Sequence, residues 1–329
     1  MRIADNTHVS EARRAAVRMA QALKFDSTAE GNLAIVVTEL ARNVLLHGGS
    51  GEVLLQPSQE SGSPWVEVLA LDRGPGINDV SKAMQDGYSS SGTPGTGLGA
   101  VRRLSAALDF YTKANEGTVI AARVVSGAPA KAEKSQTTGS VCVPIAGETR
   151  CGDAWEHQDE SGKRLIMVAD GLGHGPAASD ASQEAIAAFR ANVHKSPKEI
   201  IEAAHGRLQK TRGAAVAVAE IDFARQVVRY SGIGNISGAI VANGKSRSLI
   251  SHNGIVGHAS ERVQEFTFPW HQDAFLIMHS DGLSARWNLE HYQGLQQKSP
   301  SMIAGVLYRD FKRSRDDATV VVTREARAA

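Results

Sequence analysis

Cysteine is scarce in this sequence. Cys142 and Cys151 are the only cysteines among 329 residues. Two cysteines cannot build a disulfide framework, and their spacing is not that of a metal-binding motif. We interpret them as unpaired thiols in a reducing compartment, where disulfides rarely persist.

The chain also lacks long apolar runs and an excess of charge of one sign. No run approaches the roughly 20 apolar residues of a membrane-spanning helix. The opening MRIADNTHVSEARR has no apolar core of a signal peptide. The formal net charge is +1, and Met1–Gly127 holds 12 basic and 13 acidic residues. We therefore expect a cytoplasmic protein whose main partner is neither nucleic acid nor a membrane.

What the chain does contain is an ordinary globular balance of residues. Hydrophobic residues make up 42% and charged residues 22% of the sequence, which is enough for ordinary cores. A length of 329 residues favours two domains. Ser126–Thr138, SGAPAKAEKSQTT, is small and polar and is typical of a linker. We expect a first domain at 1–125, a linker at 126–139 and a second domain at 140–329.

The first half begins with helical patterns and continues with strands. Apolar residues recur at helical spacing in His8–Leu23, and a second helical segment, Leu33–His47, ends at Gly48-Gly49. This order predicts an α+β sandwich. The other expected elements are strands at Glu52–Gln56, Trp65–Leu71, Asp109–Lys113 and Thr118–Val125, and helices at Asp79–Asp86 and Gly99–Leu108.

Strands dominate the second half. Only two helices are expected among them, at Ala177–Val193 and Pro197–Lys210. This pattern predicts two packed sheets with flanking helices. The expected strands are Ser140–Ala146, Arg164–Ala169, Ala214–Asp222, Gln226–Gly232, Ser237–Ala242 and Ala274–His279.

Two clusters in the first half carry candidate chemistry. Glu39 and Asn43 lie four residues apart on an expected helix and share a face. A carboxylate beside an amide can orient a nucleophile and bind a divalent metal, although surface pairs with this spacing are common. Asp72 follows a strand and precedes Gly74 and Gly76. The glycines allow close approach to a ligand, and the Asp can accept a hydrogen bond from an exocyclic amine. A plain tight turn would show the same residues.

A third cluster is the glycine-rich run Gly92–Gly99, GTPGTGLG, which leads into a helix. Its backbone N–H groups and the positive end of the helix dipole suit phosphate groups. The run matches neither the Walker pattern nor the Rossmann fingerprint, because the helix follows a loop and not a strand–turn unit.

Taken in order, ELARN, DRGPG and GTPGTGLG resemble the N, first-glycine and second-glycine boxes of the GHKL ATPase superfamily, and residues 1–125 are similar to the RsbT-type serine kinases of the anti-sigma-factor family. The resemblance implies an α/β sandwich with a Bergerat-type ATP site that phosphorylates Ser or Thr of STAS-domain antagonist proteins. Positioning and charge neutralisation suffice for such phosphoryl transfer. The resemblance assigns Mg²⁺ binding to Asn43 and the general base to Glu39. It assigns the adenine pocket to Asp72, Gly74 and Gly76, and the phosphate lid to Gly95, Thr96, Gly97, Leu98 and Gly99.

Aspartates recur in turn-like settings along the second half. Asp170, Asp281 and Asp316 adjoin apolar strands, and Asp153 follows Gly152. Carboxylates at strand ends can converge at one edge of a sandwich, where hard divalent cations find oxygen ligands. Two bridged metal ions can supply a hydroxide and hold a phosphoryl oxygen. A single Asp-Gly pair is usually a turn, so the hypothesis depends on all four aspartates together.

The segments GETRCGDAW, MVADGLGHG, MHSDGL and RDDATVVV resemble the metal-dependent PPM protein phosphatases, in their SpoIIE-like and RsbX-like branch, over about 140–323. The resemblance implies a PPM-type αββα sandwich that hydrolyses phospho-Ser or phospho-Thr with Mg²⁺ or Mn²⁺. It assigns metal binding and catalysis to Asp153, Asp170, Asp281 and Asp316, with the carbonyl of Gly171 as a further ligand.

One departure from the phosphatase pattern leaves the number of metal ions open. After Gly152-Asp153 the chain continues Ala-Trp-Glu-His and lacks the further Asp of the GDxxD form. Three residues are secondary candidates. Asp317 would act less directly, His174 is a proton donor or a turn residue, and Arg150 contacts phosphate or lies on the surface.

Together, the two resemblances favour a bifunctional bacterial partner-switching regulator that phosphorylates and dephosphorylates STAS-domain antagonist or scaffold proteins. Fusion would raise the effective concentration of both activities at one target. The alternative is a phosphatase regulated in cis by a nucleotide-binding module without kinase activity; retention of Glu39 favours the first hypothesis. A binder that only sequesters a sigma factor fits less well, because the phosphatase motifs are intact. The target and the oligomeric state stay open, although related ATP domains often form homodimers.

Overall fold

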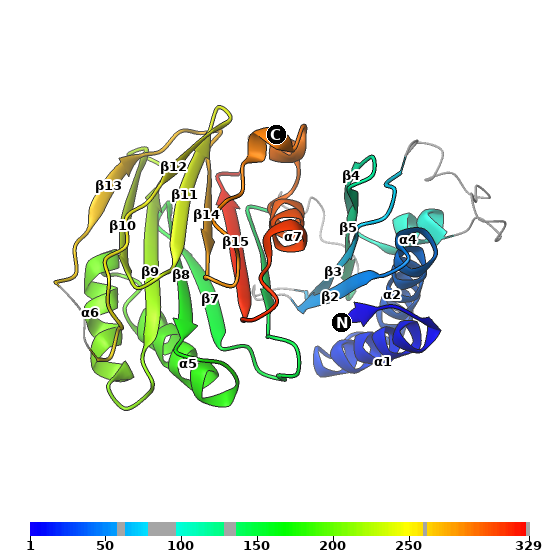
Figure 1. Ribbon diagram of the computed structural model, residues 1–329, viewed down its shortest axis with the longest axis horizontal. Coiled ribbons are helices and arrows are strands. Elements are labelled where there is room, and N and C mark those ends of the chain that lie inside the picture. The colour runs from blue at the N-terminus through cyan, green and yellow to red at the C-terminus, as the bar shows by residue number, and fades with distance from the viewer. Residues whose placement is uncertain (58–62, 78–96, 128–135, 259–261, 327–329) are drawn as a thin grey trace. The chain divides into compact units, whose positions relative to one another are not determined.

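The computed structural model describes residues 1–57, 63–77, 97–127, 136–258 and 262–326 (Figure 1). The chain divides into two compact units. The first unit contains 1–134 together with 297–309, and the second contains 135–296 together with 310–329. A segment from late in the sequence therefore belongs to the first unit, which the linear domain pattern did not indicate.

Two helices open the first unit, and each starts at an aspartate cap. Helix α1, Asn6–Ala22, begins after Asp5, whose carboxylate accepts the backbone N–H groups of Thr7 and His8. Helix α2, Ser27–Gly48, begins after Asp26, which accepts the N–H of Ala29 at 2.9 Å. Such caps satisfy donors that the first helical turn leaves unpaired. Helix α2 ends where Gly49 adopts a φ of +70°, as the sequence predicted.

The sheet of the first unit has the order β1-β2-β3-β5-β4, with every neighbouring pair antiparallel. One boundary prediction was wrong. The expected helix Gly99–Leu108 ends at Leu104, because Ala107–Lys113 pairs with β5 as a strand. The expected helix Asp79–Asp86 lies outside the described residues. The bounds are β1 Arg2–Ile3, β2 Gly51–Pro57, β3 Trp65–Asp72, α4 Gly97–Leu104, β4 Ala107–Lys113 and β5 Gly117–Val125.

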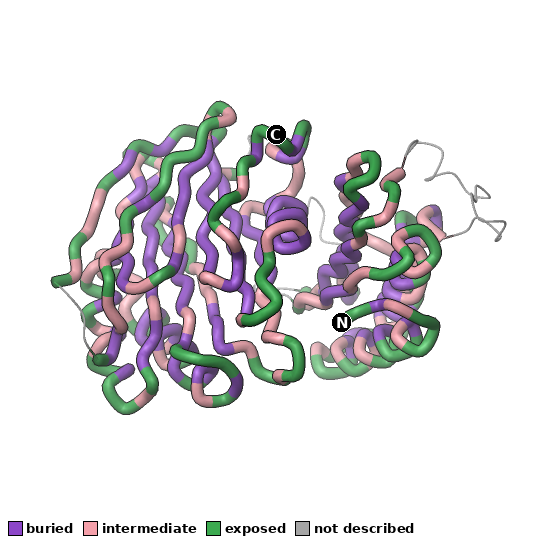
Figure 2. The backbone as a smooth tube through the Cα atoms, viewed as in Figure 1, coloured by how far each residue is buried: buried purple, intermediate pink, exposed green. Residues whose placement is uncertain are grey.

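Both faces of the central strands β3 and β5 are covered. Alternate residues of β3, such as Val66 and Val68, join the core formed with α1 and α2. The intervening Leu69 and Leu71 are also buried. They lie near Gly305 of helix α7, Pro300–Phe311. Helix α7 was not expected from the sequence, and Pro300 to Arg309 are all buried (Figure 2), as in helices that are apolar on all sides.

The second unit contains two five-stranded antiparallel sheets, with the orders β13-β10-β9-β8-β7 and β12-β11-β14-β15-β6. Strands β7, β12 and β13 were not expected from the sequence. The bounds are β6 Thr138–Val143, β7 Asp153–Glu160, β8 Lys163–Gly171, α5 Pro176–Ala191, α6 Pro197–Leu208, β9 Ala214–Asp222, β10 Val227–Ile233, β11 Ser237–Ala242, β12 Lys245–Ser248, β13 Phe266–Pro269, β14 Phe275–His279 and β15 Ala318–Arg324.

Alternation along β8 builds both layers of the second unit. Leu165, Met167 and Ala169 face a core shared with α5 and α6. Ile166 and Val168 face a second core, which contains residues of β11, β14 and β15 from the other sheet. Because successive side chains of a strand point to opposite faces, one strand contributes to both cores. The mixed α/β folds expected for the two halves are confirmed.

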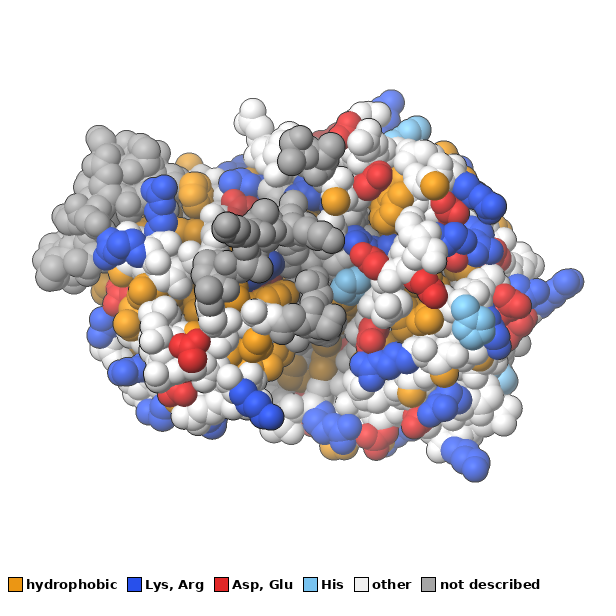
Figure 3. Space-filling view, turned by 180° about the vertical axis from the view of Figure 1, so that it is seen from behind, with side chains coloured by type: hydrophobic (Ala, Val, Ile, Leu, Met, Phe, Trp, Pro, Cys, Tyr) orange, Lys and Arg blue, Asp and Glu red, His pale blue; other side chains and the backbone are white. Residues whose placement is uncertain are grey.

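The surface carries both signs of charge. Basic and acidic side chains are interspersed on the face shown in Figure 3, in keeping with the net charge of +1. Within the described ranges, no helix combines the length and the apolar character needed to cross a membrane.

Two candidate active sites

Helix α2 presents the first candidate site along one face. Glu39 and Asn43 lie one turn apart, and Gly97 at the start of α4 lies against both. A Cβ atom added to Gly97 would come within 3.1 Å of Glu39 Oε2 and 3.7 Å of Asn43 Oδ1. The structure therefore brings the expected base, the expected metal ligand and the end of the glycine-rich run into one place. The run's Gly95 and Thr96 lie outside the described residues.

The side chains of this face are not fully satisfied by their neighbours. Asn43 Nδ2 is buried and has no hydrogen-bond partner among the described residues. An unpaired buried amide is costly, and a bound nucleotide with its metal ion would offer it polar partners. Glu39 has an ion pair with Arg42, with 3.4 Å between Oε1 and Nη1. The donor set of a carboxylate and an amide fits a hydrated Mg²⁺ ion, which takes oxygen ligands.

Asp72 ends strand β3 in a tightly packed loop. Its Oδ1 accepts the N–H groups of Gly74 at 2.8 Å and Thr118 at 3.2 Å. Gly48, at the end of α2, has to be a glycine, because an added Cβ would lie 2.5 Å from the Cβ of Asp72. Burial raises the pKa of Asp72, while these two N–H groups and the charges of Arg309 and His47 oppose the shift.

Two threonines of the β4–β5 hairpin complete this loop, and sequence reasoning missed them. Thr112 Oγ1 accepts the N–H of Ile77 at 2.8 Å and lies 3.1 Å from Thr118 Oγ1. Gly76, with a φ of +80°, would place a Cβ 2.6 Å from the carbonyl oxygen of Lys113. The sequence signal that could have pointed to Thr118 is the Gly117-Thr118 pair at the start of a strand.

The second candidate site begins with two directly opposed aspartates. Asp153 is the first residue of β7 and pairs in register with Asp170 near the end of β8. The glycines beside them are required by packing. A Cβ on Gly171 would overlap the carbonyl oxygen of Ala178, and one on Gly152 would lie 2.6 Å from Asp317 Oδ2. Gly171 thus marks the close approach of another backbone, and Gly152 that of the Asp317 side chain.

The other sheet contributes Asp281, which follows β14, and Asp316, which precedes β15. Two residues not anticipated from the sequence bond aspartates of the site. Asn235 Nδ2 donates to Asp281 Oδ2 at 2.7 Å. Ser280 Oγ, just after β14, donates at 2.6 Å to Oδ2 of Asp153, which starts β7 in the other sheet.

Asp317 is an anchor inside the fold. Only 1% of its surface is exposed. Its Oδ1 accepts the N–H of Ile145 at 2.7 Å, and its Oδ2 accepts the N–H of Gly152 at 2.9 Å. With both oxygens engaged by backbone donors, Asp317 fixes the start of the Gly152-Asp153 segment.

Electrostatic repulsion is concentrated at this edge. Burial raises the pKa of Asp170, and the charges of Asp153, Asp281, Asp316 and Asp317 raise it further. Burial is also the largest cause of the raised pKa values of Asp153 and Asp281. In the described part of the chain no three side chains form a complete metal-binding group as they stand. The donor set nevertheless fits divalent ions, because oxygen ligands and uncompensated negative charge are what such ions require.

Three further side chains near this edge have surface partners. His174 Nδ1 lies 2.8 Å from Glu148 Oε1, and Arg150 Nη2 donates to Asp180 Oδ1 at 2.9 Å. Glu156, the first acid after Asp153 on β7, pairs with Arg190 at 2.6 Å.

The two cysteines are closer than their interpretation as separate thiols suggested. Cys142 on β6 and Cys151 lie with their sulfur atoms 3.6 Å apart, and both are free thiols. The contact with Cys142 is the largest cause that raises the pKa of the Cys151 thiol. The pair lies beside Asp153, since Cys142 Sγ is 3.8 Å from the Asp153 carbonyl oxygen.

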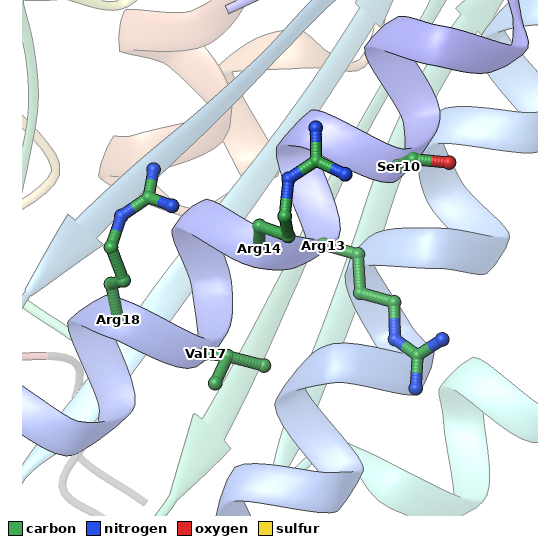
Figure 4. A pocket seen from close by; sticks show the side chains of 5 residues that line it. All are labelled: Ser10, Arg13, Arg14, Val17 and Arg18. Atoms are coloured by element: carbon green, nitrogen blue, oxygen red, sulfur yellow. The ribbon is translucent and has the colours of Figure 1, made fainter.

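Among the described residues, two surface hollows bear on the argument. One, of about 420 Å³, is polar; Asn235, Ser237, Ser251, His279 and Trp287 are among its lining residues, and it adjoins Asp281 through Asn235. The other, of about 490 Å³, is lined only by α1 residues Ser10, Arg13, Arg14, Val17 and Arg18 (Figure 4). None of the expected site residues lines the second hollow, so we place no chemistry there.

Comparison with known families divides the chain in the same order. Residues 3–124 match the family described as histidine kinase-like ATPase domain, and residues 160–325 match the family of stage II sporulation protein E (SpoIIE). The serine/threonine-protein kinase RsbT of Bacillus subtilis (strain 168) is 34% identical over 122 residues, which are 37% of this chain and 92% of RsbT.

Several solved structures have similar folds. RsbX in complex with magnesium has a TM-score of 0.52 and 23% identity, covering 58% of this chain and 96% of RsbX. The PP2C phosphatase domain of SpoIIE from Bacillus subtilis, with a fragment of its regulatory domain, has a TM-score of 0.50 and 17% identity and covers 98% of this chain and 95% of that one. A chain of the bacterial stressosome reaches a TM-score of 0.55 at 24% identity, covering 58% of this chain and all of that one. These likenesses show the fold.

Proposed function

The chain belongs to the SpoIIE family and to the family of the kinase RsbT, and on this premise we propose that it controls the phosphorylation of a partner protein with two activities. A kinase domain at 1–125 phosphorylates Ser or Thr of a STAS-domain antagonist or scaffold protein in the cytoplasm. A phosphatase domain at 140–329 removes phosphate from phospho-Ser or phospho-Thr, and 126–139 links the two.

One observation carries the phosphatase part of this proposal. Aspartates from the ends of β7, β8, β14 and β15 gather at one edge, where the charges of four others raise the pKa of Asp170. A fold rarely keeps so many repelling carboxylates together for stability alone, since each buried unpaired charge is costly. Divalent ions would supply the missing positive charge.

The residues divide the work of the hydrolysis. Asp153, Asp170, Asp281, Asp316 and the carbonyl of Gly171 would hold Mg²⁺ or Mn²⁺. Bound metal supplies an activated water and a clamp on the phosphoryl oxygen. Ser280 and Asn235 fix the orientation of Asp153 and Asp281 by hydrogen bonds. The 420 Å³ polar hollow beside Asp281 would receive residues of the partner that flank its phosphoserine or phosphothreonine.

The kinase part rests on the gathering of Glu39, Asn43 and Gly97. Glu39 accepts the proton of the partner's hydroxyl group, and Asn43 binds the Mg²⁺ ion that accompanies ATP. Asp72 accepts a hydrogen bond from the exocyclic amine of adenine, in the pocket shaped by Gly74 and Gly76. Gly95, Thr96, Gly97, Leu98 and Gly99 cover the phosphates. Positioning of this kind provides most of the catalysis in phosphoryl transfer.

The alternative function keeps the phosphatase and makes the ATP domain its regulator. The ion pair of Glu39 with Arg42 favours it, because Oε1 of the expected base is already engaged by a cation. In that case nucleotide binding would change the rate of hydrolysis without labelling the partner. Association of two copies through the ATP domain is part of either version.

Labelled ATP separates the two versions. Wild type, Glu39→Ala and Asp170→Asn are incubated with γ-labelled ATP, Mg²⁺, Mn²⁺ and a STAS-domain protein encoded nearby. Label that appears on the partner and persists longer with Asp170→Asn supports both activities. If no label appears with Asp170→Asn while wild type hydrolyses a separately phosphorylated partner, the kinase claim is wrong for that partner.

A further inference from the structure

Residues 297–309 are held to the first unit at the start of α7. Lys298 Nζ donates to Asp109 Oδ1 at 2.9 Å, and the N–H of Ser299 donates to Asp109 Oδ2 at 3.2 Å. A carboxylate at this position satisfies a donor at the helix start and complements the positive end of the helix dipole. Asp109 on β4 thus acts as a cap for a helix that lies almost 200 residues later in the chain.

The middle of α7 packs on the β3–β5 face. Gly305 lies so close to the sheet that an added Cβ would be 3.2 Å from Val119 and 3.6 Å from Leu71. One turn further, Tyr308 Oη donates to Glu52 Oε2 at 3.0 Å. The helix is therefore fixed in rotation and in translation against the sheet that carries Asp72.

Two hydrogen bonds join the end of α7 to the adenine-pocket loop. In one the donor is an arginine of α7, and in the other it is an arginine of the loop. Arg309 Nη1 donates to the carbonyl oxygen of Asp72 at 3.4 Å. Arg73 Nη2 donates to the carbonyl oxygen of Arg309. We call these two hydrogen bonds the arginine latch. Arg309 is 5% exposed, so water competes little for its guanidinium group.

Immediately after the latch, the chain is tied to the metal-site loop of the second unit. The N–H of Ser284 donates to the carbonyl oxygen of Phe311 at 2.9 Å, and the N–H of Arg313 donates to that of Gly282 at 2.7 Å. Leu283 and Lys312 form a β-bridge. The next acidic residues are Asp316 and Asp317. Arg309 is bonded to the carbonyl oxygen of Asp72, and Arg313 is bonded to that of Gly282, beside Asp281. Four peptide bonds separate these two arginines.

We propose that Arg309 is a positioning residue through which a nucleotide bound at Asp72 sets the metal affinity of the Asp281 and Asp316 loops. The proposal rests on the proposed function, because it needs a nucleotide at one site and a divalent ion at the other. A nucleotide whose amine bonds to Asp72 fixes the Asp72-Arg73 backbone and, through the latch, the end of α7. The helix passes this constraint to residues 311–316, which continue directly from its end in the chain.

Coupling of this kind is reciprocal. If nucleotide changes the affinity for metal by some factor, metal changes the affinity for nucleotide by the same factor. Coupled protein sites commonly show about 5-fold to 150-fold effects. We therefore expect a nucleotide effect of about fivefold or more on Mn²⁺ affinity in wild type, and an equal effect of Mn²⁺ on nucleotide affinity after correction for Mn²⁺ bound by the nucleotide itself.

The test uses the full chain and two readouts. Binding of Mn²⁺ is followed by titration calorimetry with and without a non-hydrolysable ATP analogue, and amide hydrogen exchange is measured over 281–284 and 311–317. The same samples are assayed with p-nitrophenyl phosphate. The variants are Arg309→Ala, Arg309→Lys and Arg73→Ala. Arg207→Ala is the matched control, because Arg207 pairs with Glu184 on the exposed surface of the second unit.

In wild type and Arg207→Ala, the analogue should shift Mn²⁺ affinity and protect 311–317. Arg309→Ala and Arg73→Ala should still bind the analogue but lose both effects, and Arg309→Lys should restore part of them. Arg73→Ala keeps the test valid if Arg309→Ala fails to fold. The proposed role of the arginine latch is wrong if the analogue still shifts Mn²⁺ affinity in both alanine variants. It is also wrong if wild type binds nucleotide and hydrolyses substrate without any shift in Mn²⁺ affinity. Absence of nucleotide binding or of hydrolysis in wild type would refute the proposed function first.

Discussion

The two candidate sites differ in how the chain assembles them. The ATP-side residues with defined positions lie between Glu39 and Gly99, and a single helix, α2, supplies two of them. The metal-side residues extend from Asp153 to Asp316 and come from the ends of strands in two sheets. The first arrangement follows from the helical period, whereas the second exists only when two sheets pack on each other.

This difference predicts different sensitivities. A change on α2 acts through immediate neighbours, since Glu39 and Asn43 stay one turn apart as long as the helix forms. A change in the core between the two sheets moves Asp281 and Asp316 relative to Asp153 and Asp170. Ser280, which follows β14, donates at 2.6 Å to Asp153 at the start of β7, and this hydrogen bond joins the two sheets at the site.

The largest effect should follow removal of one carboxylate charge from the aspartates at the ends of β7, β8, β14 and β15. Asp170→Asn keeps the side-chain shape but weakens the metal site, and loss of several kcal/mol of transition-state stabilisation lowers the rate by about 10²-fold or more. Hydrolysis of a phosphoserine peptide measures it. Asp180→Asn, an exposed acid on α5, serves as the control and should retain wild-type rates. Nucleotide binding by Asp170→Asn at saturating Mg²⁺ should be unchanged, and its loss would mean that the sites do not differ as described.

Sequence patterns located the parts of both sites that depend on short periods. The spacing of Glu39 and Asn43 gave their common face, and the Asp-Gly pairs at strand ends led to Asp170 and Asp281. The partners of these residues were missed because their contacts are distant in sequence. Ser280 lies 127 residues from Asp153, and Asn235 lies 46 residues from Asp281, and nothing local distinguishes either from a turn residue.

Helix α7 was missed for a different physical reason. The segment SMIAGVLY is apolar on every side, so it shows neither the period of a half-buried helix nor that of a half-buried strand. Its burial from Pro300 to Arg309 explains the missing period. The expected helix Gly99–Leu108 is too long because tertiary pairing with β5 makes Ala107 and Leu108 part of a strand.

The next largest effect should come from Ser280→Ala. The variant leaves Asp153 without the donor that orients it, and loss of such a supporting hydrogen bond costs about 10-fold to 100-fold in metal affinity or rate. Titration with Mn²⁺ and peptide hydrolysis measure both quantities. Ser284→Ala in the same loop is the control. Equal rates for the two variants would show that joining the sheets through Asp153 is unimportant.

Gly48→Ala should act on the ATP side alone. Its added methyl group would lie 2.5 Å from the Cβ of Asp72, so Asp72 has to move away from the position in which it accepts adenine. We expect nucleotide affinity to fall by about 10-fold, the loss of one well-made hydrogen bond, with phosphatase activity in the absence of nucleotide unchanged. Gly31→Ala in the same helix has open space around it and should stabilise α2 slightly. Binding of a fluorescent ATP analogue distinguishes the two.

The smallest expected effect is a pH dependence confined to the second unit. Burial and mutual repulsion raise the pKa values of Asp153 and Asp170 above that of an unfolded Asp. The folded metal-free protein then binds more protons than the unfolded chain above about pH 4, so its unfolding free energy falls as the pH rises toward the raised values. Mn²⁺ competes with these protons for the same oxygens. The increase in melting temperature on adding Mn²⁺ should therefore be larger near about pH 8 than near about pH 5.5. In Asp170→Asn one of the two raised carboxyls is absent, so the melting temperature of the metal-free variant should vary less with pH than that of wild type. A steeper variation would mean that other groups than these carboxylates cause the loss of stability at higher pH, and it would break the contrast between the two sites. No comparable group of mutually repelling carboxylates surrounds Asp72 in the described residues.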